Sequence, residues 1–146
     1  MSLITASHTP PLTLSPEATV LEACQKMKDN NVGAVAVVTP DNRPVGVFTE
    51  RDAVHKVIVS KRDPAELTLA EVMTSPCLAL AADRSVDDAL AVMLSKSVHH
   101  LALVDEDRQL IGMASYRTLM RERVEYLNAE VDHLSAYMGS DGIGGD

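Results

Sequence analysis

The stretch Gly46-Val47-Phe48-Thr49-Glu50-Arg51-Asp52 decides how this chain folds. Its first half continues an apolar run over residues 45–48, which is typical of a strand. Thr49 and Asp52 then match the Ser/Thr-x-x-Asp/Glu pattern of a helix capping box. The stretch therefore predicts a strand that passes directly into a helix, which we expect to reach about Val59.

The same arrangement returns 66 positions later as Gly112-Met113-Ala114-Ser115-Tyr116-Arg117-Thr118. The register extends without a gap toward the N-terminus of each copy. The identical pairs are Pro10 and Pro76, Leu12 and Leu78, Leu14 and Leu80, Val20 and Val86, Ala23 and Ala89, Met27 and Met93, Val32 and Val98, Ala36 and Ala102, Val38 and Val104, Asp41 and Asp107, Gly46 and Gly112, and Arg51 and Arg117. Such self-similarity indicates two copies of one supersecondary unit, stacked because neither buries its apolar face alone.

Each copy has the order strand, helix, strand, strand, helix. In the first copy a short strand at residues 12–14 precedes a helix that begins near Thr19 and carries apolar residues along one face. Residues 32–38 are apolar at consecutive positions, as in a strand buried on both faces. We predict an α/β (α+β) fold in which two β-α-β-β-α repeats pack as a pseudo-twofold pair, with an extended C-terminal helix.

The repeat also sets the expected boundaries: a first domain at 8–60, a linker at 61–72, a second domain at 73–127, a helical extension at 128–138 and a disordered, Gly-rich tail at 139–146. The apolar residues of the extension alternate steps of four and three, the spacing of a heptad seam: Met120, Val124, Leu127, Val131, Leu134 and Met138. This spacing favours self-association of the helix. The alternative is that the helix packs back on its own domain.

Composition narrows the partners. Thirteen Lys and Arg against twenty-one Asp and Glu give a net charge of −8, which opposes extended contact with nucleic acid or an anionic membrane. We expect a cytoplasmic protein, because no apolar run is long enough to span a bilayer and the first residues do not resemble a signal peptide. Cys24 and Cys77 lie far apart, and neither has metal-ligand spacing.

The duplicated phrase at 46–52 and 112–118 resembles the fingerprint of the cystathionine β-synthase-type (CBS) domain, over nearly the whole chain. Two such domains form a Bateman module. The resemblance implies a regulatory module whose cleft between the copies resembles the adenosine-binding site of AMP-activated protein kinase and its bacterial relatives.

The two copies differ at the residue that matters for such a site. Asp52 presents a carboxylate that can accept hydrogen bonds from two ribose hydroxyls, and the helix start at Thr49 attracts an anion. Thr118 stands at the equivalent position of the second copy. His99 and His100 precede the central strand of the second copy, where the first has Gly33 and Ala34. We therefore predict one competent site per chain.

The resemblance places the ligand-binding residues at Val47, Thr49, Arg51, Asp52, Val98, His99, His100 and Arg117. The polar residues of this set also have plainer interpretations. The Thr49 and Asp52 pair could serve only to start a helix, the two histidines could merely cap or pack, and Arg51 and Arg117 could be solvated surface charges. Strand neighbours point to opposite faces, so only one of the two histidines is expected to face the ligand.

We expect no enzymatic activity, because no nucleophile with a base, no metal set and no carboxylate pair stands out. The expected ligand is AMP, with ADP, ATP, NAD and S-adenosylmethionine as alternatives, and no cofactor or metal is required. The expected partners are a second copy of the chain, through the CBS faces and the C-terminal helix, and an unknown protein target. A ligand-free dimerisation or scaffold module is the second hypothesis. Metal or pH sensing through His99 and His100 is the third.

Overall fold

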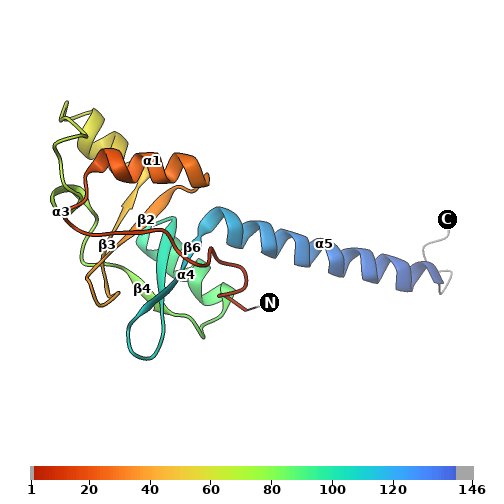
Figure 1. Ribbon diagram of the computed structural model, residues 1–146. Helices are drawn as coiled ribbons and strands as arrows, with labels where there is room; N and C mark the ends of the chain where they lie inside the picture. The colour runs from red at the N-terminus through yellow and green to blue at the C-terminus, as the bar shows by residue number, and fades with distance from the viewer. Residues whose placement is uncertain (1, 141–146) are drawn as a thin grey trace.

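The computed structural model describes residues 2–140, which form two three-stranded sheets and their helices (Figure 1). The first unit contains β1 (Thr13–Leu14), α1 (Val20–Asn30), β2 (Ala34–Val38), β3 (Pro44–Thr49), α2 (Glu50–Asp52) and η1 (Ala53–Ile58). The second contains β4 (Ala79–Ala81), α4 (Val86–Lys96), β5 (His100–Val104), β6 (Leu110–Ser115) and α5 (Tyr116–Ser140), and the short α3 (Leu69–Val72) lies between the units. The predicted β-α-β-β-α order is confirmed in both units.

The first long helix of each unit begins and ends at corresponding residues. The hydroxyl of Thr19 accepts a hydrogen bond from the Glu22 amide at 3.2 Å, and that of Ser85 accepts one from the Asp88 amide at 3.0 Å. Asn31 and Ser97 end α1 and α4 in the left-handed conformation, with φ of 52° and 55°. The repeat seen in the sequence is therefore a repeat of local structure as well.

The two sheets pack against each other through apolar side chains, half of which are alanine. In each sheet the middle strand pairs parallel with the first strand and antiparallel with the third. Side chains of β2 and β3 alternate, so that one set packs against α1 and the other faces the second sheet. The shared core between the sheets consists of Ala34, Ala36, Val47, Ala102, Leu110 and Met113. The predicted pseudo-twofold pairing is confirmed.

The two units also exchange backbone segments. Thr74, which precedes β4, forms two backbone hydrogen bonds with Val47 on β3, at 2.9 and 3.1 Å. His8, which precedes β1, forms the equivalent pair with Met113 on β6, at 2.9 and 3.1 Å. The segment leading into each unit is therefore bonded to the third strand of the other unit, and this brings Thr74 beside the start of α2.

The second helix of the first unit is not α-helical throughout. The sequence predicts one helix from Thr49 to about Val59. The structure has a single α-helical turn, α2, followed by the π-helical segment η1, in which the Val59 amide donates to the Val54 carbonyl at 3.0 Å. The extent of the helix matches the prediction. The π-helical turns of η1 were not predicted, because apolar spacing alone does not distinguish α from π geometry.

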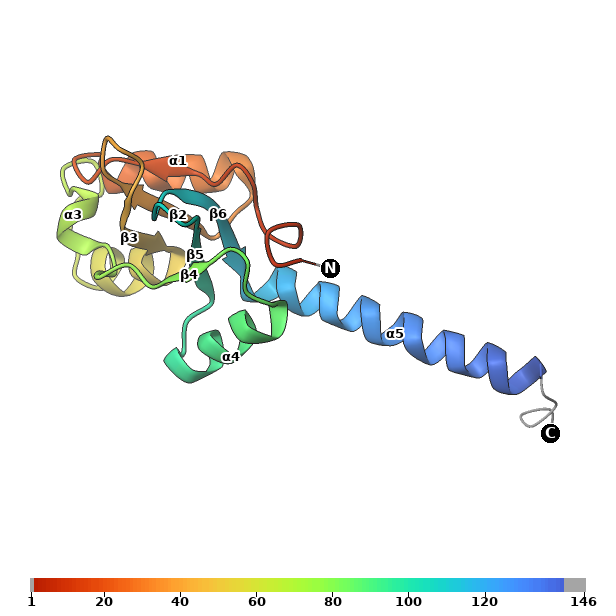
Figure 2. The same ribbon diagram turned by 90° about the horizontal axis from the view of Figure 1, so that it is seen from below.

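Helix α5 leaves the body of the molecule after its first two turns (Figures 1 and 2). Leu119 is fully buried and Met120 packs against the core of the second unit, whereas Val131 and Leu134 are each 59% exposed. Packing against its own domain therefore accounts only for the start of the helix. The tail expected at 139–146 begins within α5, and residues 141–146 lie outside the described residues. Within residues 2–140 no helix is both long and apolar enough to cross a membrane.

Candidate functional site

Thr49 and Asp52 form a reciprocal cap where β3 becomes α2. The Asp52 amide donates to the Thr49 hydroxyl at 3.2 Å, and the Thr49 amide donates to Asp52 Oδ2 at 3.0 Å. Both backbone amides at this helix start are thereby satisfied within the protein. The capping box predicted from the sequence is present, and it holds Asp52 in one orientation.

Asp52 has two further partners that the sequence did not suggest. The Lys56 ammonium lies 3.0 Å from Asp52 Oδ1, and the Thr74 hydroxyl donates to the same oxygen at 3.0 Å. Lys56 also donates to the Val72 carbonyl at 2.9 Å. Asp52 is only 6% exposed. A buried carboxylate needs such partners, because an unpaired charge away from water is costly.

The spacing of four residues between Asp52 and Lys56 is a signal that helix periodicity could have provided. Thr74 could not have been found in this way. It lies 22 residues along the chain and reaches Asp52 only because its backbone pairs with Val47.

The second unit has no carboxylate at the position equivalent to Asp52. The Ser115 and Thr118 hydroxyls are 2.8 Å apart, and the Thr118 amide donates to the Ser115 hydroxyl at 3.2 Å. The position equivalent to Lys56 is Glu122, and the position equivalent to Thr74 is His8. The first unit thus pairs an acid with a base where the second has an alcohol and an acid, so the two helix starts are chemically unlike.

His99 and His100 point to different faces of the second sheet. His99 is exposed, and its ring lies 5.7 Å from that of Tyr116. His100 lies on the face that meets the first unit: a Cβ placed on Gly33 would be 3.4 Å from its Cε1 and 2.7 Å from Glu50 Oε1. His100 is therefore the histidine that reaches across to the first unit, near the start of α2.

The surroundings of His100 disfavour its cationic form. Burial, and secondarily the neighbouring charge of His99, lower the pKa of His100 to about 4. His100 is consequently neutral near pH 7 and can offer a hydrogen bond but not a positive charge. A pH dependence of phosphate binding based on a histidine with a pKa near 6.5 is therefore not expected of His100 in the free protein.

The remaining predicted site residues are dispersed. Arg51 and Arg117 are exposed, and no hydrogen bond or ion pair of either is found within the described part of the chain. Val47 is buried in the core between the sheets, while Val98 packs against the core of the second unit. Across residues 2–140 no hydrogen bond or ion pair joins Asp52 to His99, His100 or Arg117. The structure thus brings Val47, Thr49 and Asp52 together and leaves both arginines in solvent.

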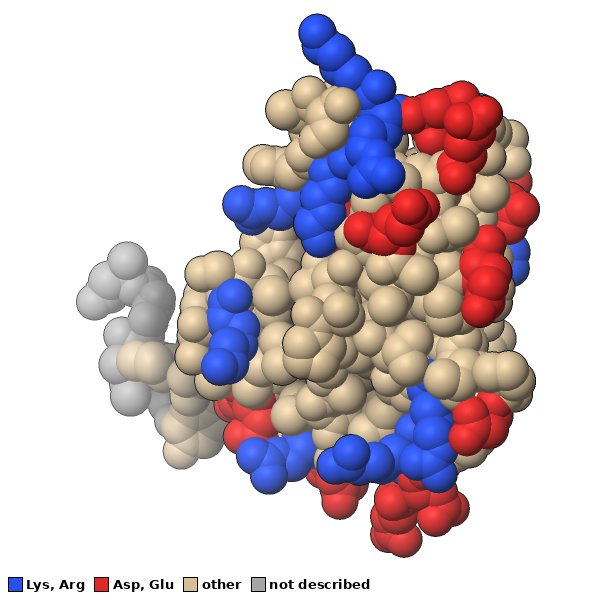
Figure 3. Space-filling view, turned by 90° about the vertical axis from the view of Figure 1, so that its left-hand side faces the viewer, with Lys and Arg blue, Asp and Glu red and all other residues tan. Residues whose placement is uncertain are grey.

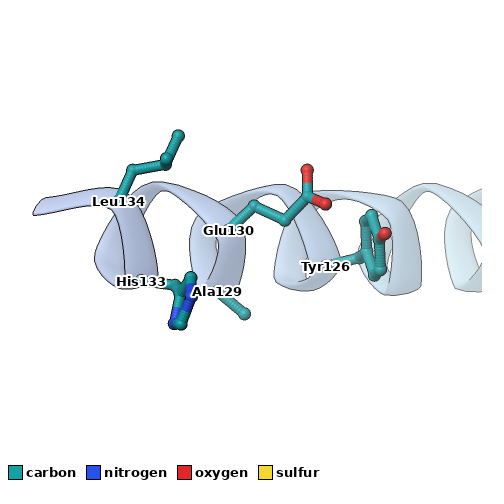
Figure 4. Close-up of a pocket in the computed structure, with 5 residues that line it drawn as sticks. All are labelled: Tyr126, Ala129, Glu130, His133 and Leu134. Carbon is teal, nitrogen blue, oxygen red and sulfur yellow. The ribbon is translucent and has the colours of Figure 1, made fainter. Parts of the chain in front are cut away.

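Two cavities are found within residues 2–140, and Asp52 lines neither of them. One of about 370 Å³ runs along α5 and is lined by Tyr126, Ala129, Glu130, His133 and Leu134 (Figure 4). A second, of about 290 Å³, lies at the linker and is lined by Arg62, Asp63, Glu66, Leu67 and Glu71. Figure 4 shows that the five side chains of the first all come from one helix, so this cavity is an open flank of α5.

Other reactive groups do not gather into a site. Within residues 2–140 no group of three or more His, Cys, Asp and Glu side chains could hold a metal ion. Burial raises the pKa of Cys77 to about 11 and also raises that of Cys24. Both thiols are therefore protonated near pH 7, which makes them poor nucleophiles.

Comparison with known proteins identifies the family. The CBS domain model matches residues 4–59 and 69–125, so the chain belongs to the CBS domain family and carries two such domains in tandem. An uncharacterized protein of Methanopyrus kandleri is 31% identical over 83% of this chain and 61% of its own length. The matched region thus spans about three fifths of that relative.

Solved structures share the fold. A CBS domain protein of Pyrobaculum aerophilum complexed with AMP has a TM-score of 0.78 at 23% identity, over 90% of this chain and 99% of that one. A CBS domain pair in complex with 5-methylthioadenosine and S-adenosyl-L-methionine also has a TM-score of 0.78, at 20% identity, over 86% of this chain and 98% of the other. The predicted family and fold are confirmed.

Proposed function

We propose that this chain is a regulatory module that binds an adenine nucleotide, with AMP as the best fit, in the cleft between its two CBS units and carries no catalytic activity. Occupancy of the cleft biases the relative angle of the units or the contact between two copies, and a separate protein reads that change. The observation that carries the proposal is the buried, oriented carboxylate of Asp52 at the start of α2, which has no counterpart in the second unit.

The contacts of Asp52 define what the ligand must do. A ribose whose hydroxyls donate to this carboxylate has to occupy the positions now held by the Lys56 ammonium and the Thr74 hydroxyl. The exchange replaces one set of hydrogen bonds with another, so its net cost is modest. His100 then lies near the opposite side of the same helix start and offers a neutral donor to the ligand. Arg51 and Arg117 have exposed side chains that can turn toward a phosphate.

Support for an adenosyl ligand also comes from fold relatives. One relative is complexed with AMP, and another with 5-methylthioadenosine and S-adenosyl-L-methionine. All three ligands contain an adenosine, whose ribose hydroxyls can donate to the Asp52 carboxylate. S-adenosylmethionine therefore stands as the leading alternative to AMP, because it offers the same ribose without a phosphate.

A second function, a ligand-free scaffold, is favoured by one specific observation. The Asp52 carboxylate already has partners within the protein, so the helix start is stable without a ligand. Under this hypothesis the chain acts only through contact with a second copy. Surfaces for this contact are supplied by exposed apolar residues on η1 and directly after it, namely Val54, Ile58 and Val59, and by the free part of α5. One face of the molecule, viewed in Figure 3, likewise has an uncharged centre with charged side chains toward its margins.

Thermal unfolding with a panel of AMP, ADP, ATP, NAD and S-adenosylmethionine separates these functions. A ligand at 100 times its Kd stabilises the folded state by about 2.7 kcal/mol, which is readily measured as a rise in Tm. We expect the largest rise with AMP. No rise with any member of the panel would favour the scaffold.

Calorimetric titration of two matched variants tests the one-site proposal. Asp52→Ala removes charge-assisted hydrogen bonds to the ligand and is expected to weaken AMP binding about tenfold or more. Thr118→Ala, at the equivalent position, is expected to leave binding unchanged. Equal losses in the two variants would contradict a single site. Because Asp52 also caps α2, the unfolding transition of each variant is measured without ligand first.

A further inference from the structure

The free part of α5 carries an apolar stripe that nothing else within residues 2–140 covers. Leu127 is 44% exposed, Val131 and Leu134 are each 59% exposed, and Met138 is 46% exposed. These four residues, called the α5 stripe below, follow the four-and-three spacing of a heptad seam. From this spacing Val131 and Met138 occupy a positions, while Met120, Leu127 and Leu134 occupy d positions.

The residue types of the stripe point to a second helix of the same kind. Aliphatic side chains at a and d positions are the ones that a coiled coil buries between its helices. In the α5 stripe, Val131 and Met138 stand at a positions, and Leu127 and Leu134 stand at d positions. A second copy of this chain offers the same stripe, so the two stripes are complementary without any further partner.

The body of the molecule determines the direction in which the two helices run. Met120 packs against the core of the second unit, and Arg123 lies 3.7 Å from Asp87 at the start of α4. Leu127 and Leu134 follow Met120 at intervals of seven residues, so they lie on the same side of α5 to within about 20° per heptad. The stripe therefore faces the side of α5 on which its own body lies, and Figure 2 shows α4 beside the start of α5.

A parallel pair would bring the two bodies to the same end and onto the same side, where they would collide. An antiparallel pair places the bodies at opposite ends. We propose that two copies of this chain associate through an antiparallel pair of α5 helices, with Val131 opposite Leu134 and Leu127 opposite Met138 of the second copy. This inference rests on the homodimer proposed above and adds which helices meet, in which direction and in which register.

The charges beside the stripe agree with this register. The flanking residues over the overlap are Asn128, Glu130, Ser135 and Tyr137, and in this register no two like charges meet. A shift of one heptad toward the body, with Val124 opposite Leu134, would place the two Glu130 side chains together. The same shift would push Met138 of the second copy against Met120, which its own body already covers.

Cysteine cross-linking in the full-length chain tests the direction. Leu127→Cys and Met138→Cys are made as separate chains, mixed and oxidised, and the parent chain with Cys24 and Cys77 serves as the blank. The mixture is expected to give a cross-linked dimer containing both chains, and each variant alone is expected to give none. In the antiparallel register residue 127 of one chain is about 16 Å along the axis from residue 127 of the other. Dimers from either variant alone would establish a parallel pair and overturn the proposal.

A matched pair of charge variants tests the surface itself. Val131→Glu places a carboxylate within the stripe and is expected to raise the dimer Kd, measured by sedimentation, at least tenfold. Ala129→Glu lies on the opposite side of the same helix and is expected to leave that Kd unchanged. An unchanged dimer in Val131→Glu would overturn the α5 contact while the proposed homodimer stands. A parent chain that is monomeric at every concentration would overturn both, and AMP titration of Val131→Glu shows whether the nucleotide site is independent of either result.

Discussion

Lys56 and Thr74 give the carboxylate of Asp52 its partners before any ligand arrives. The Lys56 side chain is 43% exposed, so its attraction to Asp52 is partly screened by water. Exposed or half-exposed ion pairs contribute about 0–1 kcal/mol. Under the proposed function a ribose takes the place of Lys56 beside Asp52, so Lys56 competes with the ligand.

The competition by Lys56 can be measured directly. Lys56→Met keeps the length of the side chain and removes the ammonium, so we expect AMP to bind about two- to fivefold more tightly, as measured by calorimetry. Lys26→Met, at an exposed position of α1, serves as the control and should bind AMP like the parent chain. Weaker binding by Lys56→Met would mean that this lysine contacts the phosphate instead.

His100 makes the stability of the folded state depend on pH. Its pKa is lowered to about 4 in the folded protein against an ordinary value of 6.5, so the unfolded chain binds more protons between these values. The contribution of His100 is present in full above pH 6.5 and is lost as the pH falls toward 4. We expect the free energy of unfolding to fall by about 2–3 kcal/mol as the pH falls through this window.

Urea unfolding at several pH values gives the measurement. Carboxylates also titrate in this range, so the informative quantity is the difference between the parent chain and His100→Gln, which cannot take up the proton. The stability of His100→Gln should fall less steeply below pH 6.5. Parallel curves for the two proteins would show that His100 is not buried as described.

At the scale of elements, the two capping motifs at the starts of α2 and α5 differ in what they hold. Thr49 caps α2 and also donates to the carboxylate of Asp52 at 3.2 Å. Ser115 caps α5, and its hydroxyl lies beside that of Thr118 and not beside a carboxylate. Thr49→Ala is expected to lower the free energy of unfolding by about 1–2 kcal/mol, and to weaken AMP binding because Asp52 loses its fixed orientation. Ser115→Ala should lower stability to a similar or smaller extent and leave AMP binding intact. Urea titration and calorimetry of both variants provide the comparison.

Secondary structure was the easier part to predict from the sequence. The start of the first helix near Thr19, the consecutive apolar run of β2 and the strand-to-helix transition at Thr49 are all local patterns, and each has a counterpart in the second copy. The π-helical turns of η1 were not predictable. Its residues have the same apolar spacing as an α-helix, and only the hydrogen bonds of the folded chain reveal the difference.

The candidate site was predicted in part for the same reason. Thr49 and Asp52 are three residues apart and could be identified from local sequence, and the histidine pair stood out against the glycine and alanine of the first copy. Which histidine reaches the first unit depends on strand register, which the sequence does not fix. Thr74 reaches Asp52 only through tertiary pairing with β3. Contacts between distant segments are therefore what sequence analysis missed.

At the scale of the whole molecule, the two units share the core between their sheets and should unfold together. Ala36 and Ala102 are fully buried between the sheets, where a larger side chain has no room. Ala36→Leu is expected to lower the free energy of unfolding by about 1–3 kcal/mol and to weaken AMP binding, because the units are pushed apart. Ala70→Leu, at an exposed position of α3, is the control. Two separate transitions in the parent chain would contradict a shared core.

The exchanged backbone segments at His8 and Thr74 bear on how such a protein could have arisen and how it can be divided. A half-length ancestor with only one repeat would have left the outer edge of its third strand unpaired. A second copy of the same ancestor could have supplied the segment that pairs with this edge. Fusion of two such genes would then have made this backbone pairing intramolecular, where it had previously required two molecules to associate. By the same logic, two halves of the present chain produced separately should remain incompletely folded alone and recover native structure when mixed.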